Sequence, residues 1–317
     1  MAAPYDVCVV GLGAAGSQAA WQLARRGRRV LGIDRYDPPH DQGSSHGRSR
    51  IIREAYFEGP GYVSLVRRAY ELWAELERES GDALLEITGG LWIGDPDGEM
   101  VRGCRAAADA HGVAIRVLAA DQVRHEFPMF VLDDGVVGVH ESRAGSLRPE
   151  AAVAAALQLA RAAGADLRTA EPVLGWDEVA GGVRVRTGDG TYGAARLILA
   201  AGPWTAELAP QVAGALTVER QTAVWLHEAH PIRGAMPVWF WEAGPGTAAY
   251  GFPPRDGLLK LALHHHGAPT TPATVDRRPD PRHTARVRAL ATRLLGDAAG
   301  PVADANVCLY KIGRAHV

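Results

Sequence analysis

The sequence has few cysteines, almost no lysine and no long apolar run. Its three cysteines, Cys8, Cys104 and Cys308, are too few to hold a fold together through disulfides, which favours a reducing, cytoplasmic setting. No run approaches the ~18 apolar residues that a membrane-spanning helix needs. The apolar run after Asp6 lacks the basic residues of a signal peptide. The formal net charge of −2 gives no reason to expect nucleic acid or an anionic membrane as a partner.

The residues that are present suit a chain with a sizeable core and more than one domain. Its 317 residues are 47% hydrophobic, which is enough to bury the interior of two domains. Positive charge is carried almost entirely by arginine, and the only lysines are Lys260 and Lys311. Because arginine serves wherever a fixed positive charge is enough, a lysine in this chain favours a point charge or a neutralisable amine.

A glycine-rich turn between a strand and a helix predicts a dinucleotide site. Residues 7–10 are apolar and precede a Gly-x-Gly-x-x-Gly turn that begins at Gly11. Gly11 allows the tight turn, Gly13 lets a pyrophosphate approach the backbone, and Gly16 lets the helix pack on the strand. The N-terminus of that helix attracts the anion. A second apolar segment ends in Asp34, which is placed to take ribose hydroxyls.

The same glycine spacing recurs at residues 188–193, but its context is different. The segment lies between an alternating strand and another strand, and no helix follows it. Asp189-Gly190 is typical of a hairpin turn, so we give this segment no cofactor role.

A polar loop follows the second apolar segment and carries many cationic and hydrogen-bonding side chains. Residues 43–56 read Gly-Ser-Ser-His-Gly-Arg-Ser-Arg-Ile-Ile-Arg-Glu-Ala-Tyr. A loop in this place tends to line the cofactor crevice, although a solvated basic loop has the same composition. The run resembles the Gly-Ser-x-His-Gly-x-x-Arg-(Ile/Leu)-Ile-Arg-x-Ala-Tyr loop of the monomeric sarcosine oxidases and N-methyltryptophan oxidases. These are flavin amine oxidases of the D-amino-acid-oxidase type.

The resemblance implies roles for individual residues of this loop, which covers the flavin in that family. Arg53 matches the arginine that binds the substrate carboxylate, and Arg50 matches the arginine beside the flavin ring. His46 and Tyr56 match positions near the substrate. Ser45 stands where the family often has a second histidine, and we count it, with Arg50, among the cofactor-binding candidates.

A second strand that contacts the cofactor is expected later in the chain. Residues 197–201 are apolar and run into Gly202-Pro203-Trp204, and small residues at such a strand end let a cofactor approach. The run resembles the second flavin-contacting strand of the family, which gives Gly202 and Trp204 a cofactor-binding role. Aromatic segments at residues 218–226 and 238–241 then indicate a sheet with a substrate-facing side.

Residues 249–264 predict a hairpin that carries Lys260 and His264. Lys260 alternates with apolar neighbours, so it either points to solvent, as strand lysines ordinarily do, or is buried. The run resembles the family's Tyr-Gly-Phe-Pro and Leu-Lys-x-x-x-His elements. In that family the lysine touches the flavin through water and promotes its reaction with oxygen, and the histidine lies near the substrate. His264 and His266 would share a strand face, but no third ligand lies at a suitable spacing, so we expect no metal.

The last informative stretch contains Cys308 and Tyr310. A free cysteine usually serves packing, as we expect for Cys104. The Cys-x-Tyr pair nevertheless resembles the family's attachment site, where cysteine sulfur bonds to the 8α carbon of the flavin. The resemblance implies FAD bound covalently through Cys308, with Tyr310 in the active site.

The fold class that these observations predict is α/β, or α+β overall. A Rossmann-like FAD-binding domain would be interleaved with a substrate domain built on a mainly antiparallel sheet. We expect the FAD-binding domain in residues 1–86 and 145–212 and its third segment in 301–317. The substrate domain would take up residues 87–144 and 213–300.

The resemblance, which extends from Val7 to Tyr310, implies an FAD-dependent amine oxidase. Its substrate would be an N-methyl or other secondary amino acid, best exemplified by sarcosine, which is oxidised to an imine while O2 is reduced to H2O2. We expect a monomer with no nucleic-acid or membrane partner. N-methyltryptophan, pipecolate or a glycated amino acid remains an alternative substrate. An NAD-dependent dehydrogenase and a non-catalytic flavin-binding protein are the alternatives from other classes.

The end of the sequence departs from the family pattern. After Tyr310 that pattern implies a Thr-x-Asp-x-x-Phe-type strand, a Gly-Phe-Ser-Gly-His-Gly-Phe-Lys-like loop with a second cationic group, and a closing helix. The tail from about residue 312 instead reads Ile-Gly-Arg-Ala-His-Val, which one reading frame of a common sequencing adapter also encodes. We therefore expect a truncated chain with a non-native tail, an unpaired sheet edge, low solubility and no activity.

Overall fold

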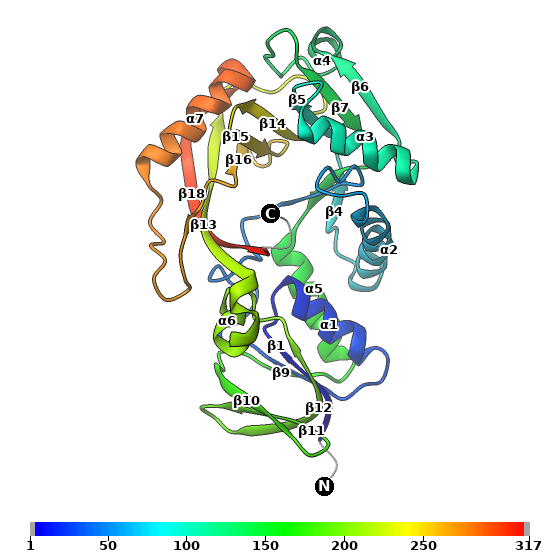
Figure 1. Ribbon diagram of the computed structural model, residues 1–317, viewed down its shortest axis with the longest axis vertical. Helices are drawn as coiled ribbons and strands as arrows, with labels where there is room; N and C mark the ends of the chain where they lie inside the picture. The colour runs from blue at the N-terminus through cyan, green and yellow to red at the C-terminus, as the bar shows by residue number, and fades with distance from the viewer. Residues whose placement is uncertain (1–3, 314–317) are drawn as a thin grey trace.

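The computed structural model describes residues 4–313, with side chains for residues 4–310, and contains three sheets. A six-stranded sheet lies in the lower lobe of Figure 1. In its order, β10-β11-β12-β1-β2-β9, the strands from β12 to β9 run parallel and the β10–β11–β12 meander is antiparallel. The strands are β1 (Tyr5–Val10), β2 (Val30–Ile33), β9 (Asp166–Arg168), β10 (Val173–Val179), β11 (Gly182–Thr187) and β12 (Thr191–Leu199).

Two helices in contact with each other cover one face of this sheet. Trp21 of α1 (Ala14–Ala24) and Leu157 of α5 (Pro149–Ala162) are at most 1% exposed and share a hydrophobic cluster with Val7. The amphipathic helix α2 (Tyr62–Ser80) adds Leu76 to the same cluster and ends at Gly81, which lies in the left-handed region. Burial of such large side chains, at ~1.5–3 kcal/mol each, holds the glycine-rich turn firmly against the sheet.

A nine-stranded sheet forms the other lobe, with β17-β13-β16-β15-β14-β5-β7-β6 in order and β18 paired to β13. The parallel pairing of β14 with β5 joins two distant parts of the chain in one sheet. The strands are β5 (Gly90–Gly94), β6 (Ile115–Ala119), β7 (Val137–Glu141), β13 (Leu216–Glu228), β14 (Val238–Gly244), β15 (Thr247–Gly251), β16 (Leu258–His264), β17 (Ala268–Pro269) and β18 (Ala299–Gly313). The remaining helices are α3 (Glu99–His111), α4 (Ala120–Glu126), α6 (Thr205–Leu208), α7 (Pro281–Leu295) and the 3-10 turns Gly202–Trp204, Pro210–Ala215 and Gly296–Ala298.

A small sheet of three strands places the arginine-rich loop between the two lobes. Its order is β3-β8-β4, with β3 (Arg50–Ile52), β4 (Leu85–Ile87) and β8 (Gly145–Leu147). Arg50 is paired with Leu147, at the point where the chain enters α5. The loop that carries the predicted site residues is therefore held by pairing with a distant strand rather than by its own sequence.

The last described strand, β18, pairs along the whole length of a strand of the nine-stranded sheet. We expected a third segment of the FAD-binding domain from residue 301, and in the structure β18 pairs along β13, from Ala299 opposite Glu228 to Gly313 opposite Leu216. The domain boundaries themselves stay a prediction.

Other expectations can be compared directly with the structure. The segment at 188–193 joins antiparallel β11 and β12 and precedes no helix, so the hairpin is confirmed. Cys104 is fully buried in a hydrophobic cluster. Within residues 4–313, no helix is both long and apolar enough to cross a membrane. The suspected non-native tail falls largely on residues 314–317, which lie outside the described residues.

Candidate functional site

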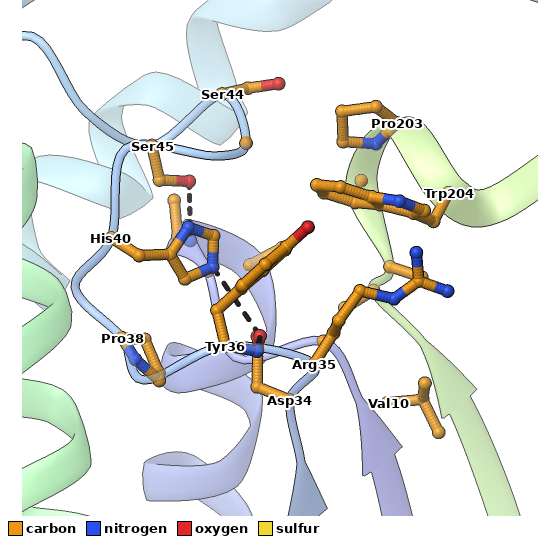
Figure 2. Close-up of a pocket in the computed structure, with 18 of the residues that line it drawn as sticks. Val10, Asp34, Arg35, Tyr36, Pro38, His40, Ser44, Ser45, Pro203 and Trp204 are labelled. Atoms are coloured by element: carbon orange, nitrogen blue, oxygen red, sulfur yellow. Dashed lines mark hydrogen bonds and ion pairs between the residues drawn. The ribbon is translucent and has the colours of Figure 1, made fainter. Parts of the chain in front are cut away.

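A first cavity, of 290 Å³, lies at the carboxyl ends of β1 and β2 and just after β12. This edge of a parallel sheet is where nucleotides bind in doubly wound folds. The sequence-predicted cofactor residues around it are Gly11, Gly13, Asp34, Ser45, Gly202 and Trp204. Figure 2 shows Asp34, Tyr36 and His40 on one side of this cavity and Pro203 and Trp204 across from them.

Two of the three glycines of the turn stand where a side chain does not fit, and the third leaves little room for one. A Cβ atom on Gly16 would lie 1.7 Å from the Gly11 carbonyl oxygen, and one on Gly11 would lie 2.4 Å from the carbonyl oxygen of Ala200. Gly11 also has a φ of +90°, which residues other than glycine rarely adopt. A Cβ on Gly13 would meet Ser45 Oγ at 3.1 Å. The turn can therefore present bare backbone to a ligand.

Asp34 and Ser45 bind the same turn from two directions. The Leu12 N–H donates to Asp34 Oδ2 at 2.6 Å, and the Tyr36 N–H donates to Asp34 Oδ1 at 2.9 Å. The Ala14 N–H, in the first turn of α1, donates to Ser45 Oγ at 3.0 Å. A hydroxyl of the arginine-rich loop thus lies at the helix N-terminus, where an anion would be attracted.

Aromatic side chains form part of the wall of this cavity. The rings of Tyr36 and Trp204 have centroids 5.7 Å apart, and the Arg35 guanidinium lies 5.5 Å from the Trp204 ring. Flat side chains of this kind suit a planar base. Tyr36 and Arg35 were absent from the sequence-based site because their positions after Asp34 carry no motif.

A second cavity, of 420 Å³, adjoins the first, and Ser44 lines both. The Ser44 hydroxyl donates to the Leu309 carbonyl, which fixes the loop against β18. The structure brings seven predicted residues to the wall of this second cavity: Arg50, Arg53, Tyr56, Lys260, His264, Cys308 and Tyr310. His46 does not line it but lines a separate cavity together with Gly47, Glu150 and other residues.

Lys260 is buried, which decides between the two possibilities left by its strand pattern. Its side chain is only 5% exposed, and Nζ donates to the carbonyl oxygens of Gly47 and Ser49 and to Ser49 Oγ, the last two at 2.8 and 3.0 Å. Burial, followed by the nearby positive charge of Arg50, lowers the pKa of Lys260 to about 7. The three oxygen acceptors therefore stabilise the ammonium form of Lys260, which burial disfavours.

Glu150 anchors the loop segment that faces Lys260. Its Oε1 accepts the N–H groups of Gly47 and Arg48 at 2.7 and 2.9 Å. Gly47 and Arg48 have φ values of +103° and +68°, so the loop turns sharply here. Glu150 was absent from the predicted site residues, because its role depends on a contact with residues about a hundred positions earlier.

Cys308, which lines the second cavity, lies beside His46. Their Sγ and Nδ1 atoms are 3.9 Å apart. Burial raises the pKa of the Cys308 thiol, and the positive charges of Arg50 and Lys260 oppose that effect. Burial and Arg50 lower the pKa of His46, which keeps its imidazole neutral near pH 7. A neutral imidazole next to a thiol can accept its proton.

Arg53 holds a carboxylate inside the second cavity. Its Nη2 atom donates to both oxygens of Glu58, at 2.6 and 2.7 Å. Its guanidinium lies 4.3 Å from the ring centroids of both Tyr56 and Phe57. Only 12% of the Arg53 side chain is exposed, so water screens its charge little and its attraction for a carboxylate is strong. Glu58 did not figure among the predicted site residues.

Aromatic side chains of the nine-stranded sheet complete the wall. His264 is packed edge-on to Phe240 and Tyr250, with centroids 5.2 and 6.4 Å apart. Burial lowers the pKa of His264 to about 3, so its imidazole is neutral. Tyr310 is 43% exposed and marks the side that is open to solvent. Phe240 and Tyr250 were not predicted individually, although the aromatic strands did suggest a substrate-facing side.

Comparison with known proteins assigns the family. The family described as DAO, FAD dependent oxidoreductase, matches residues 6–315. The chain belongs to this family. It is 39% identical to the monomeric sarcosine oxidase of Streptomyces avermitilis, over 98% of this chain and 83% of that protein. It is 34% identical to the N-methyl-L-tryptophan oxidase of Yersinia pestis, over 83% of this chain and 71% of that protein.

A solved structure extends the comparison to the fold. A mutant of NikD, an unusual amino acid oxidase essential for nikkomycin biosynthesis, superposes in its open form with a TM-score of 0.89 and 28% identity. The match covers 98% of this chain and 82% of that one. The expected fold, a Rossmann-like FAD domain with a substrate domain, is confirmed by this likeness and by the family match.

The residues around the two cavities fit FAD. The first cavity offers bare backbone at Gly11 and Gly13, a helix N-terminus, the Asp34 carboxylate and a flat wall at Trp204. The second cavity meets the first at Ser44 and is wide enough for a ring system. A ligand with a nucleotide at one end and a flavin at the other can occupy both. The family match supports FAD over the NAD that we kept as an alternative.

Proposed function

We propose that this FAD-dependent oxidoreductase oxidises an N-methyl or other secondary amino acid, with sarcosine as the best candidate. The observation that carries the proposal is the position of Arg53. Its guanidinium binds the Glu58 carboxylate within a cavity that adjoins the dinucleotide cavity. An amino acid supplies such a carboxylate. The similarity to a sarcosine oxidase and an N-methyltryptophan oxidase supports the same substrate class.

In this proposal Arg53 exchanges Glu58 for the substrate carboxylate. A bidentate contact fixes both the position and the orientation of the amino acid. The neutral imidazole of His264 then faces the amine without repelling it, and Tyr56, whose pKa is raised by burial, stays protonated as a hydrogen-bond donor. The amine must be neutral to give up electrons, and this uncharged part of the wall favours that form.

Bound FAD supplies the chemistry that takes a hydride equivalent from the carbon next to nitrogen and passes two electrons to dioxygen. The substrate becomes an imine, which water hydrolyses, and dioxygen becomes H2O2. Lys260 contributes a localised positive charge at the wall of the second cavity, where charge develops as dioxygen is reduced. We assign it the role of promoting that reduction.

We further propose that Cys308 carries the flavin covalently, as a thioether to the 8α carbon. The bond replaces the thiol proton and one hydrogen of the 8α methyl group, and dioxygen takes up the two electrons released. His46, at 3.9 Å, is placed to accept the thiol proton. The positive charges of Arg50 and Lys260 favour the thiolate.

N-methyltryptophan remains a second candidate because the cavity wall is rich in aromatic side chains, including Phe240 and Tyr250. The test is a panel of sarcosine, N-methyltryptophan, pipecolate and a glycated amino acid, read by peroxide release from flavin-loaded protein. Peroxide with sarcosine as the preferred substrate supports the proposal, and turnover with none of the four contradicts it. We also propose a monomeric, cytoplasmic protein, and size-exclusion chromatography with light scattering tests its oligomeric state.

A further inference from the structure

Glu141, the last residue of β7, is a buried carboxylate whose side chain reaches out of its own sheet. It is 1% exposed, and its backbone is paired with both β5 and β6. Its Oε1 atom accepts the N–H of Glu54 at 2.7 Å, and its Oε2 atom accepts the N–H of Ala55 at 2.8 Å. A strand in the interior of the nine-stranded sheet therefore holds two successive backbone amides directly after Arg53.

The two N–H groups match the carboxylate form of Glu141. A carboxylate has two acceptor oxygens and no donor, so each oxygen can take one N–H group. Burial raises the pKa of Glu141, whereas the N–H groups of Glu54 and Ala55 and the positive charge of Arg53 lower it. Hydrogen bonds to an ionised acceptor are stronger than neutral ones, so this segment is held firmly.

The segment in turn holds the guanidinium of Arg53. Nη1 of Arg53 donates to the carbonyl oxygen of Ala55 at 3.3 Å, while Nη2 binds the two oxygens of Glu58. Ala55 thus accepts from Arg53 through its carbonyl group and donates to Glu141 through its N–H group. Among the side chains that the structure describes, that of Glu141 lies outside the wall of the second cavity, so it reaches a ligand there only through other residues.

The side chain of Glu54 fixes the same segment to two further parts of the chain. Glu54 is 3% exposed, and its carboxylate forms ion pairs with Arg67 of α2 at 2.9 Å and with Arg143 at 3.2 Å. Arg67 also donates to the carbonyl oxygen of His111, the last residue of α3. The residue next to Arg53 is therefore held through both its backbone and its side chain, and it can keep its place while Arg53 changes partner.

We propose that Glu141 is a positioning residue for the substrate carboxylate, acting through the peptide groups after Arg53 on the guanidinium of that arginine. The inference rests on the proposed function, in which Arg53 exchanges Glu58 for the carboxylate of an amino acid. With one nitrogen held on the Ala55 carbonyl, the other nitrogen stays directed into the second cavity when Glu58 leaves. A guanidinium that is held in advance binds the incoming carboxylate without first having to be ordered.

A double-mutant cycle tests whether Glu141 acts through Arg53. Flavin-loaded Glu141→Gln, Arg53→Met and the double variant are reduced anaerobically by sarcosine, and the rate constant divided by the dissociation constant is measured for each. An amide has one acceptor oxygen and directs its NH2 group at the second N–H, so Glu141→Gln should lower this ratio about tenfold, mainly through weaker binding. In the Arg53→Met background the same substitution should lower it less than about twofold.

Glu171→Gln is the matched control. Glu171 is also buried, at 5% exposure, and accepts the hydroxyl groups of Thr187 and Tyr192 at 2.6 and 2.8 Å, beside the six-stranded sheet. This variant should reduce with sarcosine as the wild type does. A tenfold loss from Glu141→Gln in both backgrounds overturns the inference, because Glu141 would then serve the fold and not Arg53. An unchanged ratio in a folded Glu141→Gln protein overturns it as well.

Crystals of the unaltered protein soaked in acetate provide a second measurement, which needs neither a variant nor turnover. Arg53 should bind acetate in place of Glu58 while its Nη1 atom stays on the Ala55 carbonyl. Loss of that contact when acetate binds contradicts the inference. If sarcosine is not oxidised but Arg53 holds acetate in this way, the proposed function fails while the positioning role stands. If sarcosine is oxidised but the two substitutions act independently, the positioning role fails while the proposed function stands.

Discussion

Replacing Lys260 by Met should alter how the free energy of unfolding depends on pH. Burial lowers the pKa of this amine from an ordinary value of 10.5 to about 7. Between these two values the unfolded chain binds a proton that the native chain has released, so the native state gains stability as pH rises. Below pH 7 the amine is charged in both states, and the native state bears the full cost of the buried charge.

The magnitude follows from the size of the shift. Each pH unit between about 7 and 10.5 should add about 1.4 kcal/mol to the stability of the wild type relative to Lys260→Met. The gain over the whole window is of the order of 5 kcal/mol. Lys260→Met also loses three hydrogen bonds, two of them at 2.8 and 3.0 Å. This loss lowers the stability of the variant by an amount that changes little with pH. The slope is therefore more informative than the absolute difference.

Urea unfolding of the two proteins at several pH values measures this slope. Taking the difference between them cancels the titration of all other groups that the substitution leaves unchanged. Arg255→Met is the matched control, because it likewise replaces a cationic side chain by Met, but at an exposed ion pair. Parallel stability curves for wild type and Lys260→Met from pH 7 to 10 would refute the reasoning. They would mean that the three oxygen acceptors hold the ammonium at its ordinary pKa.

Four further outcomes are expected from single substitutions. Arg53→Met should lower kcat/KM for sarcosine about 100-fold or more through loss of the proposed bidentate carboxylate contact, whereas an unchanged kcat/KM would remove Arg53 from the site. Cys308→Ala should release all flavin into the supernatant on acid precipitation, while the wild type retains it in the pellet. Gly11→Ala should abolish flavin binding, since its Cβ would lie 2.4 Å from a backbone oxygen; full flavin occupancy would contradict this. In stopped-flow half-reactions, Lys260→Met should slow reoxidation by dioxygen far more than anaerobic reduction, and equal losses would indicate a binding role.

The parts of the site that depend on local sequence were predictable. The glycine turn needs glycine for steric reasons that act within a few residues, so Gly11 and Gly16 could be placed from spacing alone. The arginine-rich loop was recognisable as a continuous run, which is how Arg53 was found. These features require no knowledge of what packs against them.

The parts that depend on distant contacts were not predictable. Glu150 binds the loop from the start of α5, and Glu58 matters only because the Arg53 side chain turns toward it. A strand pattern cannot say which face is buried when neighbours on both sides are apolar, so the burial of Lys260 had to come from the structure. The pairing of β18 with β13 likewise brings Cys308 to the loop through register, which the sequence does not encode locally.

The central claim is that the two adjoining cavities hold FAD and an amino acid whose carboxylate is bound by Arg53. Anaerobic mixing of flavin-loaded protein with sarcosine tests it most directly, and it also tests the opposing expectation of an inactive chain that we drew from the tail sequence. The account predicts that the long-wavelength absorption band of oxidised flavin is lost with saturation in sarcosine, and that admitting dioxygen restores the band with one H2O2 for each flavin. A band that sarcosine and the other secondary amino acids all leave unchanged, in a protein shown to contain FAD, would contradict it.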